Sequence, residues 1–229
     1  MHITGLNETV LLIIKFSLGG TLRFLSHAEM LRVFQRACVR AGFNIQYSQG
    51  FNPRPKMSLP LPRPVGVESD EELLCLRICK ELRVRQSDAD KLCHFVRDKL
   101  SAQLPEGCVL SSISIAQTGT SFQPCSATYV LAVRPEYLNE DLTARIELLL
   151  ASESLSVRRQ TGKKNAKPKN VDVRDFLKSI KADDRSIIVE CNISPAGSIR
   201  IDEILGLLEL DTGKLALPIR RINVQWKVD

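Results

Sequence analysis

The amino-acid sequence predicts an α+β protein of two consecutive units, each built on an antiparallel sheet. Two observations lead to this prediction. Short apolar or alternating runs, typical of strands, are interspersed with longer runs whose apolar residues recur every three or four positions, as in amphipathic helices. The same order of elements then occurs twice, on either side of the turn-rich stretch 117–125. We expect a first unit over residues 1–118 and a second over 119–229.

In the first unit the order of elements is strand, helix, two strands, helix, strand. This is the split β-α-β, or ferredoxin-like, arrangement. A short MSL segment at 57–59 adds a possible edge strand. The expected strands lie near 9–17, 43–48, 71–79 and 108–116, and the expected helices near 27–41 and 88–103.

The second unit repeats that order, with little identity of residues between the halves, so the repeat is one of architecture. Asn139 is the expected cap of its first helix. The expected strands lie near 126–134, 154–160, 185–193 and 217–229, and the second helix near 201–210.

The first long helix has a strong start signal. Ser26 and Glu29 form the pattern of a capping box, in which each side chain satisfies a backbone N–H of the other residue. Arg32, Arg36 and Arg40 recur every four residues, opposite the apolar face. The arginine row is either a solvated face or a stripe that faces phosphates.

A specialised loop follows this helix at Gln49–Lys56. Gly50 permits a backbone conformation closed to other residues, and Pro53 and Pro55 restrict the chain to extended shapes. A rigid loop with amide, cationic and aromatic groups suits a phosphate, a nucleotide or single-stranded nucleic acid, although a prolyl connection with incidental charge is the alternative. The candidate contact residues are Tyr47, Gln49, Phe51, Asn52, Arg54 and Lys56.

A second basic loop, at 161–170, occupies the equivalent place in the second unit. It is either a solvated hairpin or a second contact for a phosphate backbone, and two such loops could flank one groove. Its candidate residues are Lys163, Lys164, Lys167 and Lys169.

His27 is the one plausible catalytic imidazole. It lies in the first turn of the helix, where the helix N-terminus favours an anion and a neutral imidazole. It could act as a base beside a phosphate, contact a ligand, or have a structural role. No second histidine accompanies it at metal-ligand spacing, so we expect no metal site. Our spatial hypothesis is that the capped helix start at Ser26 and the Gln49–Lys56 loop converge in one cationic pocket.

Composition sets the context. The formal net charge is +6, which permits an anionic partner without requiring one. No stretch approaches the roughly 20 apolar residues that span a bilayer, and the N-terminus lacks the features of a signal peptide. The seven cysteines include no Cys-x-x-Cys pair, which is typical of a reducing compartment. We therefore expect a cytoplasmic protein with no membrane contact.

The pattern RFLSH, RVFQRA and YSQGFNPRPKMSLPLPRPVGVES resembles the uncharacterised radical-SAM-linked protein family, whose domain occurs alone or fused behind B12-binding radical SAM modules. The match is dense over roughly residues 15–80 and departs at Cys75, where that pattern leads us to expect an acidic residue. The resemblance implies association with a radical SAM enzyme that acts on RNA. The Cys-x-x-x-Cys-x-x-Cys motif for the cluster is missing, so no cofactor is expected in this chain; the iron–sulfur cluster and S-adenosylmethionine are expected only in a partner.

We therefore expect an accessory RNA-binding protein that acts with a separate radical SAM enzyme and is not an enzyme by itself. One alternative is an RNA-processing enzyme that uses His27, because tandem ferredoxin-like units resemble the CRISPR RNA-processing endonucleases; the glycine-rich loop of those enzymes is missing here. The other alternative is a protein-docking domain that binds through strand edges and contacts no nucleic acid.

Overall fold

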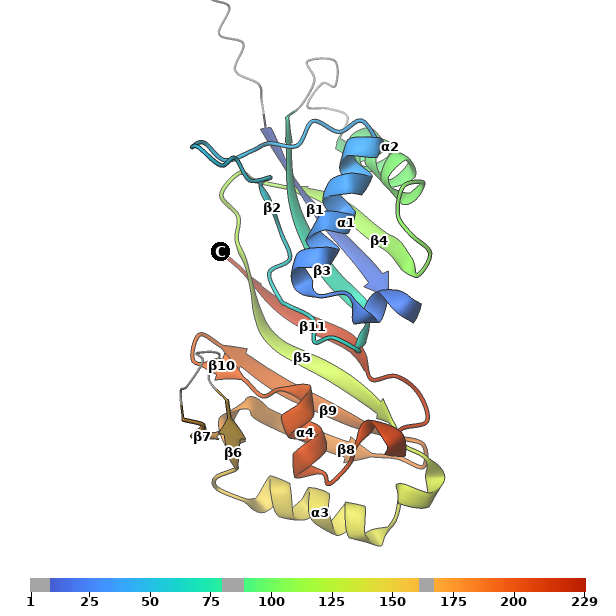
Figure 1. Cartoon of the computed structure of the whole chain (residues 1–229), viewed down its shortest axis with the longest axis vertical. Helices are drawn as coiled ribbons and strands as arrows, with labels where there is room; N and C mark the ends of the chain where they lie inside the picture. Colours follow the sequence, from blue (N-terminus) through green and yellow to red (C-terminus); the bar gives the residue numbers. More distant parts are fainter. Residues whose placement is uncertain (1–8, 80–88, 161–166) are drawn as a thin grey trace, which may run out of the picture. The chain divides into compact units, whose positions relative to one another are not determined.

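The computed structural model describes residues 9–79, 89–160 and 167–229. The fold is α+β, with mostly antiparallel sheet and four α-helices in the described residues (Figure 1). The chain divides into two compact units: unit 1 comprises Met1–Gln123 and Lys227–Asp229, and unit 2 comprises Pro124–Trp226. The change of unit therefore lies between Gln123 and Pro124, and three C-terminal residues belong to unit 1.

Unit 1 is a sheet with the strand order β4-β1-β3-β2, in which all neighbours are antiparallel. A 3-10 helix, η1, joins the first strand to the first helix. The bounds are β1 (Thr9–Leu18), η1 (Gly20–Phe24), α1 (His27–Arg40), β2 (Met57–Ser58), β3 (Glu68–Cys79), α2 (Ala89–Ser101) and β4 (Cys108–Ala116).

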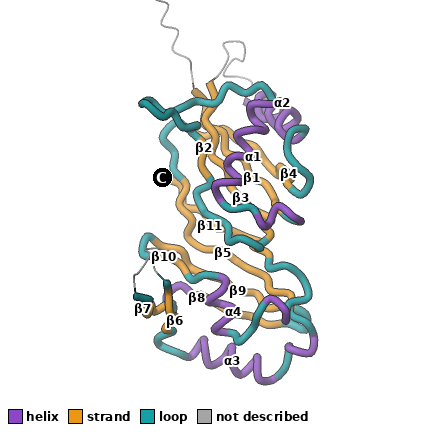
Figure 2. The backbone as a smooth tube through the Cα atoms, viewed as in Figure 1, coloured by secondary structure: helices purple, strands orange, loops and turns teal. Residues whose placement is uncertain are grey.

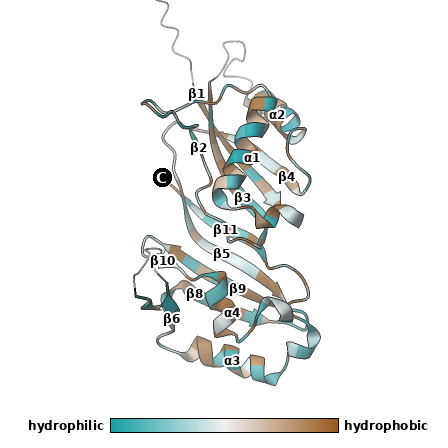
Figure 3. Ribbon diagram, viewed as in Figure 1, coloured by the Kyte–Doolittle hydropathy of each residue, from teal (hydrophilic) through white to brown (hydrophobic). Residues whose placement is uncertain are grey.

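Both helices of unit 1 cover the same face of this sheet. Alternate residues of β1 point toward them, and Phe16 makes an edge-to-face contact with Phe34 of α1, with 4.7 Å between ring centroids. Val96 and Leu100 of α2 complete the core. In Figure 3, hydrophobic and hydrophilic residues alternate along α1, as expected for a helix with one buried face.

In unit 2 the strands lie in the order β10-β9-β5-β11, and β8 also pairs with β9. Its buried apolar residues come mainly from β5, β9, α3 and α4. The bounds are β5 (Phe122–Ala132), η3 (Pro135–Tyr137), α3 (Glu140–Ala151), β6 (Ser156–Arg159), β7 (Lys169–Asp172), η4 (Arg174–Phe176), β8 (Leu177–Ala182), β9 (Ser186–Ser194), β10 (Gly197–Ser198), α4 (Ile201–Leu207), η5 (Thr212–Lys214) and β11 (Arg220–Val228).

Two of the expected strands differ from the structure. The segment 43–48 makes only isolated bridges, Ile45 to Ile78 and Tyr47 to Pro55, and the short β2 takes the edge position beside β3. In the second unit, the expected strand 154–160 is β6, which pairs with β7 in a separate two-stranded sheet (Figure 2).

The position beside β9 is taken by β8 because β8 carries the apolar residues. Leu177 and Ile180 are 3% and 5% exposed, whereas the Ser156–Arg159 strand has no buried residue. A strand with a single apolar residue, Val157, among a serine and two arginines gains little from burial in a sheet that packs against helices. Among the described helices, none is both long and apolar enough to cross a membrane.

Candidate nucleic-acid interface

The loop after α1 folds into a hairpin over residues 46–56, which we call the 46–56 hairpin. Pro53 and Pro55 have no amide hydrogen, so Arg54 and Lys56 supply the donors of the returning arm. The Arg54 amide donates to Ser48 Oγ at 2.9 Å, and the Lys56 amide donates to the Gln46 carbonyl at 2.7 Å. The Ser48 amide donates back to the Arg54 carbonyl at 2.8 Å. The two arms are therefore joined by hydrogen bonds that use both the Arg54 and the Lys56 amides.

The base of the hairpin is held by Arg77, near the end of β3. The Gln46 amide donates to the Arg77 carbonyl, and the Arg77 amide donates to the Lys56 carbonyl, both at 2.9 Å. A third bond joins the Cys79 amide to the Asn44 carbonyl at 2.8 Å. Both arms are thus attached to β3, and the side chains of Lys56 and Arg77 come from adjacent backbone segments.

The tip of the hairpin exposes an aromatic ring. Phe51 is 107% exposed and Tyr47 is 39% exposed. Gly50, beside the tip, has φ of +127°, a conformation that disfavours residues with a Cβ. A phenylalanine with no packing partner contributes nothing to the core, whereas a nucleobase can stack on an exposed ring. Gln49, Asn52 and Arg54 are exposed around it.

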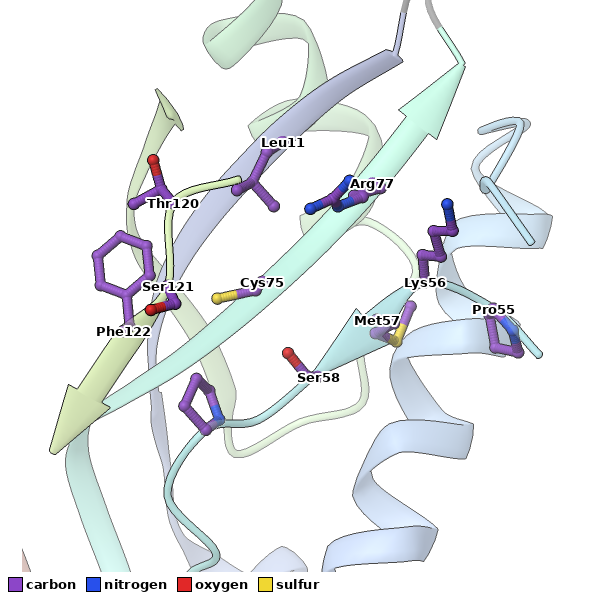
Figure 4. A pocket seen from close by; sticks show the side chains of 11 residues that line it. Leu11, Pro55, Lys56, Met57, Ser58, Cys75, Arg77, Thr120, Ser121 and Phe122 are labelled. Atoms are coloured by element: carbon purple, nitrogen blue, oxygen red, sulfur yellow. The ribbon is translucent and has the colours of Figure 1, made fainter. Parts of the chain in front are cut away.

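Next to the hairpin base, a hollow of about 590 Å³ lies on the sheet face opposite the helices (Figure 4). We call it the β3 hollow; its lining includes Lys56, Ser58, Cys75, Arg77, Ser121 and Phe122, all in unit 1. The strand register explains this set. Leu11 is opposite Arg77 and Ser58 is opposite Cys75, and side chains that face each other across an antiparallel pair project on the same side of the sheet.

Charge in the β3 hollow is positive. Within the described parts of the chain, no carboxylate forms an ion pair with Lys56, Arg77 or Arg54. Burial raises the pKa of the Cys75 thiol, while a hydrogen bond with Ser58 and the charge of Arg77 act to lower it. The thiol therefore adds no negative charge at neutral pH, and the two cations are available to an anion.

The helix start carries the expected capping box. The Ser26 amide donates to Glu29 Oε2 at 2.8 Å, and the Glu29 amide donates to Ser26 Oγ at 3.4 Å. His27 lies beside a cavity of about 10 Å³, which it shares with Arg63 and Glu72; that is room for about one water molecule. The Nδ1 atom of His27 is buried and finds no hydrogen-bond partner among the described residues.

The helix start and the 46–56 hairpin are not brought together. His27 is the first residue of a helix of 14 residues, which is roughly 20 Å long, and the hairpin follows the other end of that helix. Along β3, the cavity beside His27 is lined by Glu72, whereas the hairpin is attached at Arg77 and Cys79. The single cationic pocket of our spatial hypothesis is therefore absent from the described residues, because α1 separates its two halves.

Arg63 is a residue whose role the sequence did not indicate. Its guanidinium donates to the main-chain carbonyls of Leu22 at 3.3 Å and Leu25 at 3.1 Å, and also to Arg23 at 2.8 Å. It donates further to the carbonyls of Pro64 and Val67 on its own segment. Arg63 thus joins the proline-rich segment after β2 to the chain just before α1, and so positions Ser26 and His27.

The arginine row of α1 divides into two roles. Arg32, Arg36 and Arg40 line a surface hollow of about 380 Å³ along the helix. Arg40 is engaged within the protein, because its Nη2 donates to the Gln103 carbonyl at 2.7 Å and its Nε to Gln103 Oε1 at 3.2 Å. Arg32 and Arg36 are exposed, with no hydrogen bond to another described residue.

The second basic loop is described in part. Lys163 and Lys164 lie outside the described residues. Lys167 and Lys169 are exposed in unit 2, and Lys169 begins β7. The hairpin lies in unit 1, so a groove flanked by both loops stays a prediction. Within the described parts of the chain, no group of three His, Cys, Asp or Glu residues could hold a metal ion.

These features define an α+β protein of two units that presents a cationic, aromatic-tipped hairpin beside a preformed hollow. The chain belongs to an uncharacterised protein family conserved in bacteria, DUF2344, whose model matches residues 12–203. No curated protein matches the sequence. The matched range includes α1, the 46–56 hairpin and the β3 strand to which the hairpin is attached.

Proposed function

We propose that this protein binds single-stranded RNA through the 46–56 hairpin and presents it to a separate radical SAM enzyme. The main support for RNA binding is the fully exposed ring of Phe51, on a hairpin whose base is hydrogen-bonded to β3. A ring held at a rigid tip loses little entropy when a base stacks on it, and cations at the base of the same hairpin can pair with the phosphate backbone. The partnership with a radical SAM enzyme is supported by the resemblance of the SQGFNPRPK segment and its surroundings.

The strand orders support the finer fold assignment, two ferredoxin-like units. Unit 1 has its strands in the order β4-β1-β3-β2, with α1 and α2 as the connections that cross the sheet. In unit 2, the order β11-β5-β9-β8 is equivalent once β6 and β7 are treated as an insertion. Sheets of this kind commonly present one face and its loops to RNA, as RRM domains do.

Binding can be tested with a fluorescently labelled 12-nucleotide single-stranded RNA and anisotropy. Phe51→Ala is expected to weaken binding by about 5- to 100-fold, since stacking contributes roughly 1–3 kcal/mol per base. Arg54→Gln is expected to weaken binding and to reduce the slope of log K against log salt by about 0.7, the value for one phosphate contact on a single strand.

The matched control is Phe95→Ala, because Phe95 is another exposed phenylalanine, 52% exposed, on α2. This variant is expected to bind RNA like the unaltered protein. Failure of the unaltered protein to bind single-stranded RNA at 50 mM salt would refute RNA binding. Equal effects of Phe51→Ala and Phe95→Ala would refute the hairpin as the contact.

The radical SAM partnership needs a separate measurement. The tagged protein is expected to co-purify with a radical SAM enzyme from native lysate, both before and after ribonuclease treatment if the contact is direct. If such an enzyme is retained in 0.5 M salt while no RNA binds, the docking alternative replaces the present proposal, because apolar contacts resist salt whereas phosphate contacts do not.

The enzyme alternative has less support from the geometry. The cavity beside His27 has a volume of about 10 Å³, so a ribose phosphate does not fit there without movement of Arg63 or Leu61. The proposal is therefore non-enzymatic, and His27→Ala is expected to leave RNA binding intact. RNA cleavage by the purified protein that His27→Ala abolishes would reverse this conclusion.

A further inference from the structure

The lining of the β3 hollow changes in chemical character from one end of the hollow to the other. Figure 4 shows the side chains of Lys56 and Arg77 toward one end, those of Thr120, Ser121 and Phe122 toward the other, and those of Ser58 and Cys75 between them. A volume of about 590 Å³ lies within the range of small-molecule sites, roughly 300–1,000 Å³. The hollow therefore offers cations, then hydrogen-bonding groups, then an aromatic ring.

Both walls of the hollow are held by backbone bonds. On one side, β2 pairs with β3 so that Ser58 faces Cys75 and Met57 faces Leu76. On the other side, Ser121 and Asp229 exchange two bonds: the Ser121 amide donates to the Asp229 carbonyl at 3.0 Å, and the Asp229 amide donates back at 3.1 Å. The hollow is therefore formed before any ligand arrives, which reduces the entropic cost of binding.

The charge around the hollow favours an anion. Lys56 and Arg77 have no acidic partner within the described residues. Asp229 is the backbone partner of Ser121. Its side-chain carboxylate accepts a hydrogen bond from Gln123 Nε2 at 2.9 Å and forms an ion pair with Lys227 Nζ at 2.9 Å. The ion pair with Lys227 offsets part of the charge of Asp229, and Asp229 is bonded to Ser121, at the end of the hollow away from Lys56 and Arg77 (Figure 4). A phosphate near Lys56 and Arg77 therefore meets two cations.

We propose that the β3 hollow binds one phosphorylated nucleoside unit, with the phosphate between Lys56 and Arg77 and the base against Phe122. The ribose then lies near the hydroxyls of Ser58 and Ser121. An arginine and a lysine together supply a forked donor and a point charge, which suits a phosphate monoester or diester. The unit can come from an RNA strand, in which case the inference rests on the proposed function, or from a free nucleotide.

Cys75 provides a reporter inside the hollow, and Cys125 provides one outside it. Cys75 lines the hollow, whereas Cys125 is exposed and lies in unit 2. Alkylation of each thiol by N-ethylmaleimide at pH 8.5 can be followed at the level of peptides by mass spectrometry. The probes are AMP, adenosine, inorganic phosphate and a 12-nucleotide single-stranded RNA.

AMP is expected to slow alkylation of Cys75 at least fivefold and to leave the rate at Cys125 unchanged. Adenosine and inorganic phosphate alone are expected to protect much less, because each fills one end of the hollow. Binding of a fluorescent N-methylanthraniloyl derivative of AMP, followed by anisotropy, provides a second measurement that does not depend on the reactivity of Cys75. Arg77→Gln and Lys56→Gln are each expected to raise the Kd for that derivative about tenfold.

Lys99→Gln is the matched control, because Lys99 is an exposed cation on α2, against the other face of the sheet. It removes the same charge and is expected to leave the Kd unchanged. Ser58→Phe, at an exposed position of the lining, is expected to abolish binding by filling the hollow. Thermal unfolding of each variant identifies any loss of binding that comes from loss of fold.

The outcomes separate the two proposals. Protection by AMP and by RNA supports the site with RNA as a source, and protection by RNA alone supports RNA as the only source. Protection by AMP without any RNA binding keeps the site for free nucleotides and refutes the proposed function. RNA binding that depends on Phe51 but not on Arg77, with no protection of Cys75, overturns the site and keeps the proposed function. Binding of neither probe overturns both.

Discussion

The guanidinium of Arg40, at the end of α1, donates to the main-chain carbonyl of Gln103 at 2.7 Å. Gln103 follows the last turn of α2, so this bond joins the C-terminal ends of the two helices that cover the sheet of unit 1. A cation beside a helix C-terminus also interacts favourably with the helix dipole. Arg40 therefore stabilises the fold, although its spacing makes it a member of the same row as Arg32 and Arg36.

Replacement of Arg40 is expected to lower stability, whereas the same change at Arg36 is not. Arg40→Gln loses two hydrogen bonds from a charged donor, which corresponds to a decrease of about 1–2 kcal/mol in the free energy of unfolding of unit 1. Arg36→Gln is the control, because Arg36 is exposed on the same helix. Urea denaturation followed by circular dichroism measures both. Equal midpoints for the two variants would contradict this role for Arg40.

Arg63→Met is expected to cost on the order of 3 kcal/mol of stability, because carbonyls before α1 and in the segment after β2 lose their donor. Arg63→Lys is expected to recover only part of this loss, since a lysine has no planar fork to reach several carbonyls at once. Hydrogen exchange gives a local check: the amides at the start of α1 should exchange faster in both variants. Unchanged exchange there would show that other contacts position the helix start.

The capping box predicts a dependence of stability on pH. Hydrogen bonds from the Ser26 side chain and backbone lower the pKa of Glu29 below its ordinary value of 4.5. A carboxyl whose pKa is lowered in the folded state stabilises the fold above the ordinary pKa, and that contribution is lost as pH falls through the lowered value. Ser26→Ala removes the N-cap and is expected to destabilise the fold by about 1 kcal/mol at pH 7.

The difference between Ser26→Ala and the unaltered protein is expected to shrink as the pH falls below about 4.5. Thermal unfolding at pH 7, 5, 4 and 3 gives the measurement, and Ala28→Ser, one position past His27 and exposed, is a control substitution on the same turn. A difference that stays constant across this pH range would show that Glu29 takes no part in the cap.

The cysteines are expected to differ in reactivity. Burial raises the pKa of Cys38, Cys108 and Cys191 to about 12, so almost none of these thiols is ionised at pH 8. Cys125 is exposed. In the native protein, iodoacetamide should modify Cys125 within minutes and leave the three buried thiols intact, whereas all should react in 6 M guanidinium chloride. Rapid native modification of Cys191 would contradict the burial of β9.

Sequence periodicity was sufficient for elements whose signal is local. The Ser26–Glu29 cap, the apolar face of α1 and the alternation along β1 each depend on residues within a few positions of one another. The strand 154–160 was different. Its length and alternation suit a strand. Whether it enters the main sheet depends on competition with the more apolar strand Leu177–Ala182, and the local sequence pattern carries no information about that competition.

The candidate interface shows the same division. The sequence alone indicated the residues of the hairpin, because glycine and proline constrain the backbone wherever they occur and the charges lie next to them. It gave no sign that Arg77 lies beside Lys56 or that Arg63 reaches Leu22, since strand register and side-chain reach across the fold join residues far apart in the chain. The sequence-based hypothesis also placed His27 beside the hairpin. Nearness in sequence does not show which end of a helix a loop lies at, and the hairpin follows the end of α1 opposite His27.

By itself, therefore, the sequence determined the α+β class, the capped helix and the stiff cationic turn, all of which follow from torsional preferences and short-range periodicity. Only the tertiary structure decided that Lys56 and Arg77 share a hollow with Phe122, and that α1 keeps His27 away from it. Those relations depend on how the strands pair and which faces are buried, and these are settled by the packing of the whole unit.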